Sequence, residues 1–140
     1  MNDLSLEITK TIHAPIEEVF DAWLDPNMLA QFILPMPGMP QPDVENEAVE
    51  GGRFTIVMSV GDDKIPHTGT YIKISRPEKL VFSWESPFSI DGSTVTINLK
   101  RIEKNITEIQ LSHIRFPDEE SRSNHQGGWA NILDKLNEVL

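Results

Sequence analysis

Alternation of apolar and polar residues dominates the middle of the chain and constrains the fold more than any other feature. Apolar side chains recur at every second position there, as at Phe54, Ile56 and Met58. This period is typical of strands with one buried face. Turn sequences such as residues 61–63 separate successive strands at short intervals. The pattern therefore predicts an antiparallel sheet with one apolar face.

Helical spacing replaces the alternation in two segments. Ile16, Val19 and Phe20 begin an amphipathic stripe just after Pro15, a residue that suits the first turn of a helix. A further short turn or two of helix is expected over residues 27–32. A second, longer helix is expected to begin between residues 118 and 121, and its stripe consists of Trp129, Ile132, Leu133, Leu136, Val139 and Leu140.

The order of these elements indicates an α+β fold. A sheet with one apolar face must bury that face on helices, which gives two layers, and we expect residues 1–140 to form a single domain. Gly127 and Gly128 lie inside the predicted C-terminal helix. Two adjacent glycines cost roughly 1–2 kcal/mol relative to alanines in a helix interior. They predict either a kink or a group that packs tightly against the backbone there.

Residues 35–42 are rich in proline and cannot form a regular helix or a central strand. One interpretation is a plain connector. The alternative is a cover over an apolar opening, which would give Met36 and Met39 a role.

Composition excludes several classes of protein. The chain has 140 residues and no cysteine, which excludes disulfides, thiolate metal sites and thiol nucleophiles. Its net charge of −10 is the opposite of what a nucleic-acid-binding surface needs. Residues 1–70 hold twelve acids and three bases. This excess is either a solvated face that aids solubility or a docking face for a basic partner around Glu17, Glu18 and Asp21.

Nothing in the sequence resembles a targeting or membrane segment. The first residues include Asp3 and Glu7, where a secretion signal would need basic residues and then an apolar run. No apolar stretch approaches the length of about 20 residues that a membrane-spanning helix needs. We therefore expect a soluble, cytoplasmic protein.

Several segments resemble one known family, that of the activator of the ninety-kilodalton heat-shock protein ATPase, within the START-like or SRPBCC superfamily. The matching segments are residues 12–26 (IHAPIEEVFDAWLDP), 51–54 (GGRF), 67–72 (HTGTYI), 77–84 (PEKLVFSW) and 127–129 (GGW). The resemblance implies a helix-grip fold, as in the birch pollen allergen. In this fold a curved antiparallel sheet of about six to seven strands wraps a long C-terminal helix, and a short helix pair follows the first strand. It also implies an apolar cavity between helix and sheet. Members of the superfamily bind lipids, sterols, polyketides and plant hormones there, and a few catalyse cyclisations or hydrolyses.

No recognisable catalytic or metal motif accompanies this resemblance. The four histidines are far apart in sequence and have no metal-ligand spacing, so neither a metal nor a cofactor is expected. His125 and Tyr71 are the weak catalytic candidates. A partly buried imidazole can orient a carbonyl or act as a general base, although a purely structural role is the simpler interpretation of both residues.

The favoured function is binding of an apolar or amphipathic small molecule, because no catalytic set is apparent. A drug-sized ligand would need roughly 300–1,000 Å³. Two alternatives stay open: a chaperone-associated interaction protein, and a cyclase or hydrolase that uses the same cavity. The predicted ligand-binding residues are Tyr71, Phe82, Trp84, His125, Trp129, Ile132, Leu133 and Leu136.

Overall fold

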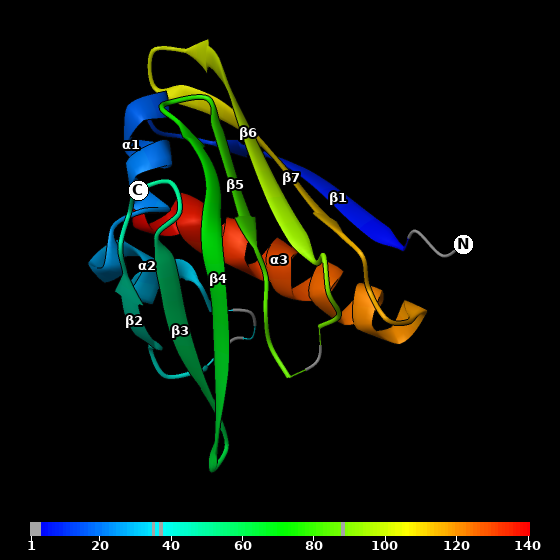
Figure 1. The fold of residues 1–140 in the computed structure, drawn as a ribbon. Coiled ribbons are helices and arrows are strands. Elements are labelled where there is room, and N and C mark those ends of the chain that lie inside the picture. The colour runs from blue at the N-terminus through cyan, green and yellow to red at the C-terminus, as the bar shows by residue number, and fades with distance from the viewer. Residues whose placement is uncertain (1–3, 35, 37, 88) are drawn as a thin grey trace.

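A computed structural model describes residues 4–34, 36, 38–87 and 89–140. The described elements, in chain order, are β1 (Ser5–Ile12), α1 (Ile16–Ala22), α2 (Pro26–Phe32), β2 (Asp43–Asn46), β3 (Arg53–Val60), β4 (Asp63–Ser75), β5 (Lys79–Ser83), β6 (Thr94–Glu103), β7 (Ile106–Ile114) and α3 (Glu119–Val139). The strands of the described residues form one antiparallel seven-stranded sheet in the order β1-β7-β6-β5-β4-β3-β2. The sheet curves around α3, and α1 and α2 lie together beside one end of α3 (Figure 1). This confirms the predicted α+β, helix-grip architecture.

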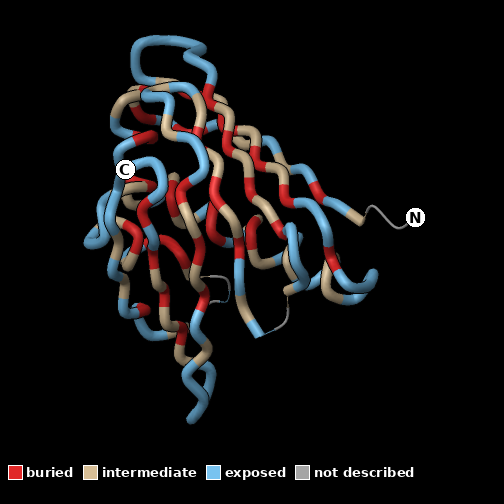
Figure 2. Tube along the Cα trace, in the orientation of Figure 1, coloured by how far each residue is buried: buried red, intermediate tan, exposed pale blue. Residues whose placement is uncertain are grey.

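Burial alternates along the strands as the sequence pattern predicts (Figure 2). On the inner face of the sheet, Val95 of β6 stands opposite His113 of β7, and Ile97 stands opposite Leu111. All four of these side chains are buried. The register therefore places a histidine among the aliphatic residues that face α3.

Side-chain caps fix where two of the helices begin. The carboxylate of Asp25 accepts hydrogen bonds from the backbone N–H groups of Asn27 and Met28, ahead of α2. Asp118 caps α3 by accepting a hydrogen bond from the N–H of Ser121. The predicted start of the long helix is confirmed. Its buried residues are Trp129, Ile132, Leu133 and Leu136.

Helix α3 runs without interruption through Gly127 and Gly128. A Cβ atom added to Gly127 would meet no atom within 4 Å. The expectation that some group of the protein packs tightly against the backbone is therefore wrong at Gly127. The space beside this glycine is open.

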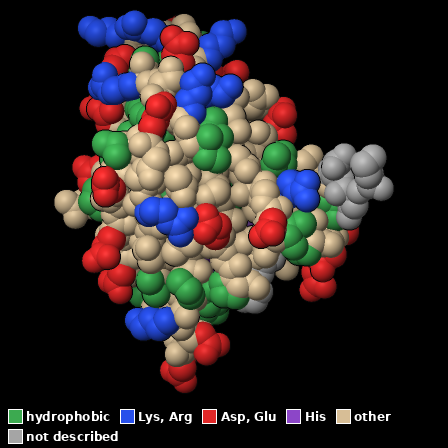
Figure 3. Space-filling view, viewed as in Figure 1, with side chains coloured by type: hydrophobic (Ala, Val, Ile, Leu, Met, Phe, Trp, Pro, Cys, Tyr) green, Lys and Arg blue, Asp and Glu red, His purple; other side chains and the backbone are tan. Residues whose placement is uncertain are grey.

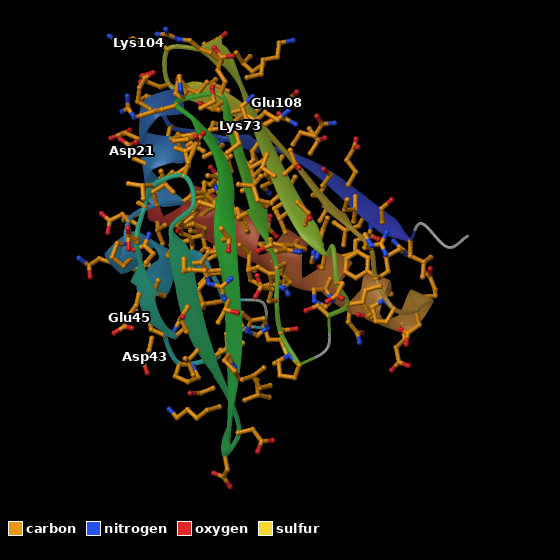
Figure 4. The ribbon with its side chains drawn as sticks, in the orientation of Figure 1. Asp21, Asp43, Glu45, Lys73, Lys104 and Glu108 are labelled. Carbon is orange, nitrogen blue, oxygen red and sulfur yellow. The ribbon has the colours of Figure 1, made fainter. Side chains whose placement is uncertain are left out.

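Charged side chains lie outside the core and join its layers at the edges. Lys10 of β1 forms an ion pair with Asp134 of α3, and Arg76, which follows β4, forms a bidentate pair with Asp21 of α1. The view of the outer surface shows scattered charges with no large single-sign face (Figure 3). Lys73 and Lys104 lie toward one end of the sheet, whereas acidic residues of β2 lie toward the other (Figure 4). In the described part of the chain, no helix has the length and the apolar composition needed to cross a bilayer.

Candidate functional site

A pocket lies between the middle of α3 and the strands that face it. Its volume is about 140 Å³, which is close to the size of a cavity that holds one benzene ring. We call it the inner pocket, and its lining residues are Met58, His67, Trp84, Asn124, His125, Gly128, Trp129 and Ile132. No lysine, arginine, aspartate or glutamate is among them. The inner pocket alone is smaller than a drug-sized ligand requires.

A larger open groove of about 540 Å³ lies beside the inner pocket, between the projecting β3–β4 hairpin and α3. The groove shares five lining residues with the inner pocket: Met58, His67, Asn124, His125 and Gly128. Its other lining residues are Met36, Met39, Val60, Ile65, Ser123, Gly127 and Asn131. The two methionines that the sequence suggested as a cover over an apolar opening thus lie at such an opening. Pro35 and Pro37, from the same segment, lie outside the described residues.

A separate small void lies deeper in the core, beside α1 and α2. Trp23, Tyr71 and Phe82 are among the residues that line it, and its volume is about 10 Å³, room for about one water molecule. The hydroxyl of Tyr71 accepts a hydrogen bond from Nδ2 of Asn46 at 3.0 Å. Burial raises the pKa of this hydroxyl above its ordinary value. Tyr71 is therefore a neutral, hydrogen-bonded core residue near neutral pH.

His113 is held in one tautomer by its neighbours. The indole Nε1–H of Trp129, which can only donate, lies 3.0 Å from Nδ1 of His113. Nδ1 must accept this bond, so Nε2 carries the proton and donates to Oγ of Ser93 at 2.7 Å. In a nucleophilic serine–histidine pair the proton moves the other way, from the hydroxyl to an unprotonated nitrogen. This buried trio is consequently structural.

His125 carries its proton on the other ring nitrogen, Nδ1. Its Nδ1 lies 2.8 Å from the carbonyl oxygen of Ser121, which can only accept, so Nδ1 donates. In the neutral ring, Nε2 is then an acceptor. The ring packs edge-on to that of His113, with centroids 5.4 Å apart, and it lines both the inner pocket and the groove. His125 can thus accept a hydrogen bond or a proton from a bound molecule.

His67 and Trp84 form the opposite wall of the inner pocket, with ring centroids 5.1 Å apart. Burial lowers the pKa of His67 to about 4, and the nearby His125 adds to this effect. Among the described residues, neither Nδ1 of His67 nor Nε1 of Trp84 has a hydrogen-bond partner. A buried polar atom without a partner costs about 1–3 kcal/mol. The wall of the inner pocket therefore contains unused hydrogen-bonding capacity.

Sequence comparison decides the family of this chain. The profile described as activator of Hsp90 ATPase homolog 1-like protein matches residues 13–140. The chain belongs to this family. None of the curated proteins matches it.

Several solved structures share this fold. A protein from Chromobacterium violaceum superposes with a TM-score of 0.84 at 22% identity, covering 98% of this chain and 97% of its own. An AHSA1-like protein from Aeromonas hydrophila has a TM-score of 0.80 at 25% identity, covering 96% and 90%. An HSP90 activator from Plasmodium falciparum has a TM-score of 0.77 at 23% identity, covering 97% and 95%.

In this family member, the predicted site residues fall into three groups. Four of them line the inner pocket together: Trp84, His125, Trp129 and Ile132. Trp84 also lines the small void with Tyr71 and Phe82, which are not among the lining residues of the inner pocket. Leu133 and Leu136 are fully buried and belong to neither lining. Their proposed role in ligand binding stays a prediction.

The sequence interpretation missed His67, His113 and Met58 as neighbours of this site. One signal was available, because His113 shares the parity of Ile109 and Leu111 and must face inward with them. Parity places a residue on a face but does not say which residue of the helix lies above it. Although three histidines converge here, no group of three or more potential ligands among the described residues is placed to hold a metal ion.

Proposed function

We propose that this family member binds a small, uncharged, mostly apolar molecule, with one ring in the inner pocket and the remainder in the groove. The observation that carries the proposal is that the two spaces adjoin and share five lining residues. The inner pocket is of a size for one ring, and the groove adds the volume that a larger ligand needs.

The lining chemistry supports an uncharged ligand. Met58, Trp84 and Trp129 supply apolar and aromatic surface, while Nε2 of His125 is a hydrogen-bond acceptor. No lysine or arginine is among the described residues that line the pocket or the groove, and burying a carboxylate without a partner costs several kcal/mol. The net charge of −10 also opposes the approach of anions.

Native mass spectrometry of freshly purified protein tests the proposal. A co-purifying small molecule is expected on the unmodified chain and should be bound more weakly or lost in Ile132→Phe, because this side chain lines the inner pocket and the longer ring would narrow it. The matched control is Ile72→Phe, at a residue that is 54% exposed. An apo mass alone, together with no rise in melting temperature on addition of 1-naphthol, would count against ligand binding.

A second candidate is interaction with a chaperone of the Hsp90 class. The family description and the similarity to the HSP90 activator from Plasmodium falciparum favour it. The prediction from the sequence places the contact at Glu17, Glu18 and Asp21 of α1. Arg76 forms an ion pair with Asp21 at 2.8 Å and lowers the pKa of its carboxyl group. One of the three acids is therefore already paired within the protein.

Charge reversal at α1 separates this candidate from the first. If the acidic face binds a chaperone, Glu18→Lys should weaken capture by purified Hsp90, and salt should weaken it further because exposed charges are screened. Capture that is unchanged in Glu18→Lys would show that the acidic face is not the contact.

A cytoplasmic location of the protein stays a prediction from the sequence.

A further inference from the structure

Gly127 lies in the interior of α3, where a glycine lowers stability, and no side chain of the described residues packs against it. It is exposed in the interior of α3, and a glycine there costs about 1 kcal/mol relative to alanine. A Cβ atom at this position would meet nothing within 4 Å. No contact within the described chain requires the missing side chain. The open space therefore suits an occupant from outside.

Two residues that lie four positions before and after Gly127 line the same groove. Ser123, Gly127 and Asn131 are exposed, have short side chains, follow one another at intervals of four residues and line the groove. Rows with this spacing are the lines along which two helices pack against each other. A second helix can thus approach α3 closely here.

The wall that faces this row is apolar and partly exposed. Met36 is 46% exposed and Val60 is 38% exposed, and Met39 and Ile65 complete the wall. Methionine side chains are unbranched and polarizable, so they adapt to the apolar face of a bound helix. On the α3 side of the groove a partner can come close to the helix backbone. On the other side it meets apolar side chains that can adapt to its shape.

Acidic residues lie near the groove in three places, although none is among its described lining residues. Asp62 and Asp63 lie at the turn of the hairpin, next in sequence to the groove wall. Asp118 and Glu120 line a neighbouring hollow that shares Asn124 and His125 with the groove. Asp134 and Glu138 line another hollow, which shares Met36 and Asn131.

Three bases lie beside these six acids, and a fourth, Arg122, forms an ion pair with Glu119 on the same stretch of α3. Lys10 pairs with Asp134, Lys135 lies 3.9 Å from Glu138, and Lys64 lies beside the acids of the hairpin turn. The margin of the groove keeps an acidic excess after these pairings. Its charge complements a cationic partner.

We infer that the groove is a docking site for an amphipathic helix of a partner protein, with its apolar face against Met36, Val60 and Ile65 and with Lys or Arg at its margins. A second copy of this chain would bring the same acidic margins together, and each copy carries a net charge of −10. Nucleic acids and anionic membranes are repelled by the same margins. This inference goes beyond the proposed function, because its occupant is a protein segment, which would compete with any part of a small molecule that extends from the inner pocket into the groove.

Fluorescence anisotropy with a labelled amphipathic peptide of leucine and lysine tests the inference. Gly127→Met should weaken binding of this peptide at least about tenfold, because the new side chain extends into the groove. Gln126→Met is the matched control: it places the same side chain on an adjacent exposed position of α3 that does not line the groove, and it should change little. Circular dichroism verifies that both variants are folded.

A second set of variants tests the role of charge in peptide binding. The double variant Asp62→Lys, Asp63→Lys should weaken binding and reduce its dependence on salt, and a peptide of leucine and glutamate should not bind. Ile132→Phe narrows the inner pocket at a residue that does not line the groove, so it should leave peptide binding unchanged, and failure of the ligand proposal is distinguishable from failure of this one. Absence of binding to the unmodified protein would overturn the inference. Equal binding by Gly127→Met and the unmodified protein would overturn it too, because the attraction would then be unspecific.

Discussion

The indole nitrogen of Trp129 donates a hydrogen bond to Nδ1 of His113, at 3.0 Å, and so joins α3 to the inner face of β7. The other ring nitrogen of His113 donates to Ser93. Both nitrogens of a fully buried imidazole are satisfied in this way, and its tautomer is fixed. The same contact orients Trp129, which lines the inner pocket.

Ser93→Ala should lower the free energy of unfolding by about 1–3 kcal/mol, because it leaves the buried Nε2–H of His113 without an acceptor. Urea unfolding measures this change. Ser112→Ala is the control, since Ser112 lies on the outer face of β7, next to His113, and its loss should cost much less. Equal effects of the two substitutions would contradict the assigned hydrogen bond.

Stability should fall as the pH is lowered from about 7 to about 5. Burial lowers the pKa of His113 to about 3 and that of His67 to about 4, from an ordinary value of 6.5. Below pH 6.5 the unfolded chain binds protons that the folded chain excludes. The free energy of unfolding is then expected to fall by up to about 1.4 kcal/mol per pH unit for each histidine.

His67→Gln should remove one histidine's share of the slope. His13→Gln is the comparison variant, because it removes an exposed imidazole in place of a buried one. The pKa values of the carboxyl groups of Asp21 and Glu85 are lowered, so their contribution to the free energy of unfolding is lost only at more acidic pH. Measurements above about pH 5 therefore report on the histidines and not on these two carboxylates. A slope that is the same in all three proteins would contradict a buried, neutral His67.

Two glycines should respond to alanine in opposite directions. Gly127→Ala should raise the free energy of unfolding by about 1 kcal/mol, because α3 gains a better helix former and the new methyl group meets no atom. In Gly69→Ala, the added Cβ would collide with the carbonyl oxygen of Ser83 and with the ring of Phe54. That substitution should cost about 1–3 kcal/mol or more. Chemical denaturation of both variants checks the pair, and a loss of stability in Gly127→Ala would show that the space beside α3 is not free.

Local periodicity was sufficient to predict the sheet, the long helix and its buried stripe, because each depends on side chains a few residues apart. Periodicity also placed Trp84, His125, Trp129 and Ile132 on inward faces, while the family resemblance implied a cavity between helix and sheet; these four residues line one pocket. Periodicity could not show that Tyr71 lies at a different place from these four residues. Strand parity places Tyr71 on the inner face, but the position along β4 decides that it lies at the small void.

Tyr71→Phe should therefore leave the affinity for a small aromatic probe unchanged while it removes the hydroxyl that accepts from Asn46. His125→Phe, at the boundary of the inner pocket and the groove, should alter that affinity at least about fivefold. Isothermal titration of both variants with 1-naphthol provides the comparison. A larger effect of Tyr71→Phe would move the site to the small void.

The inner pocket is tested most directly by NMR, because the chain has three tryptophans and two of them line it. Titration of the ¹⁵N-labelled protein with 1-naphthol should shift the indole N–H signals of Trp84 and Trp129, saturably, and Ile132→Phe should abolish these shifts. Indole signals that do not move at millimolar probe, or that move equally in Ile132→Phe, would contradict a ligand site between α3 and the sheet.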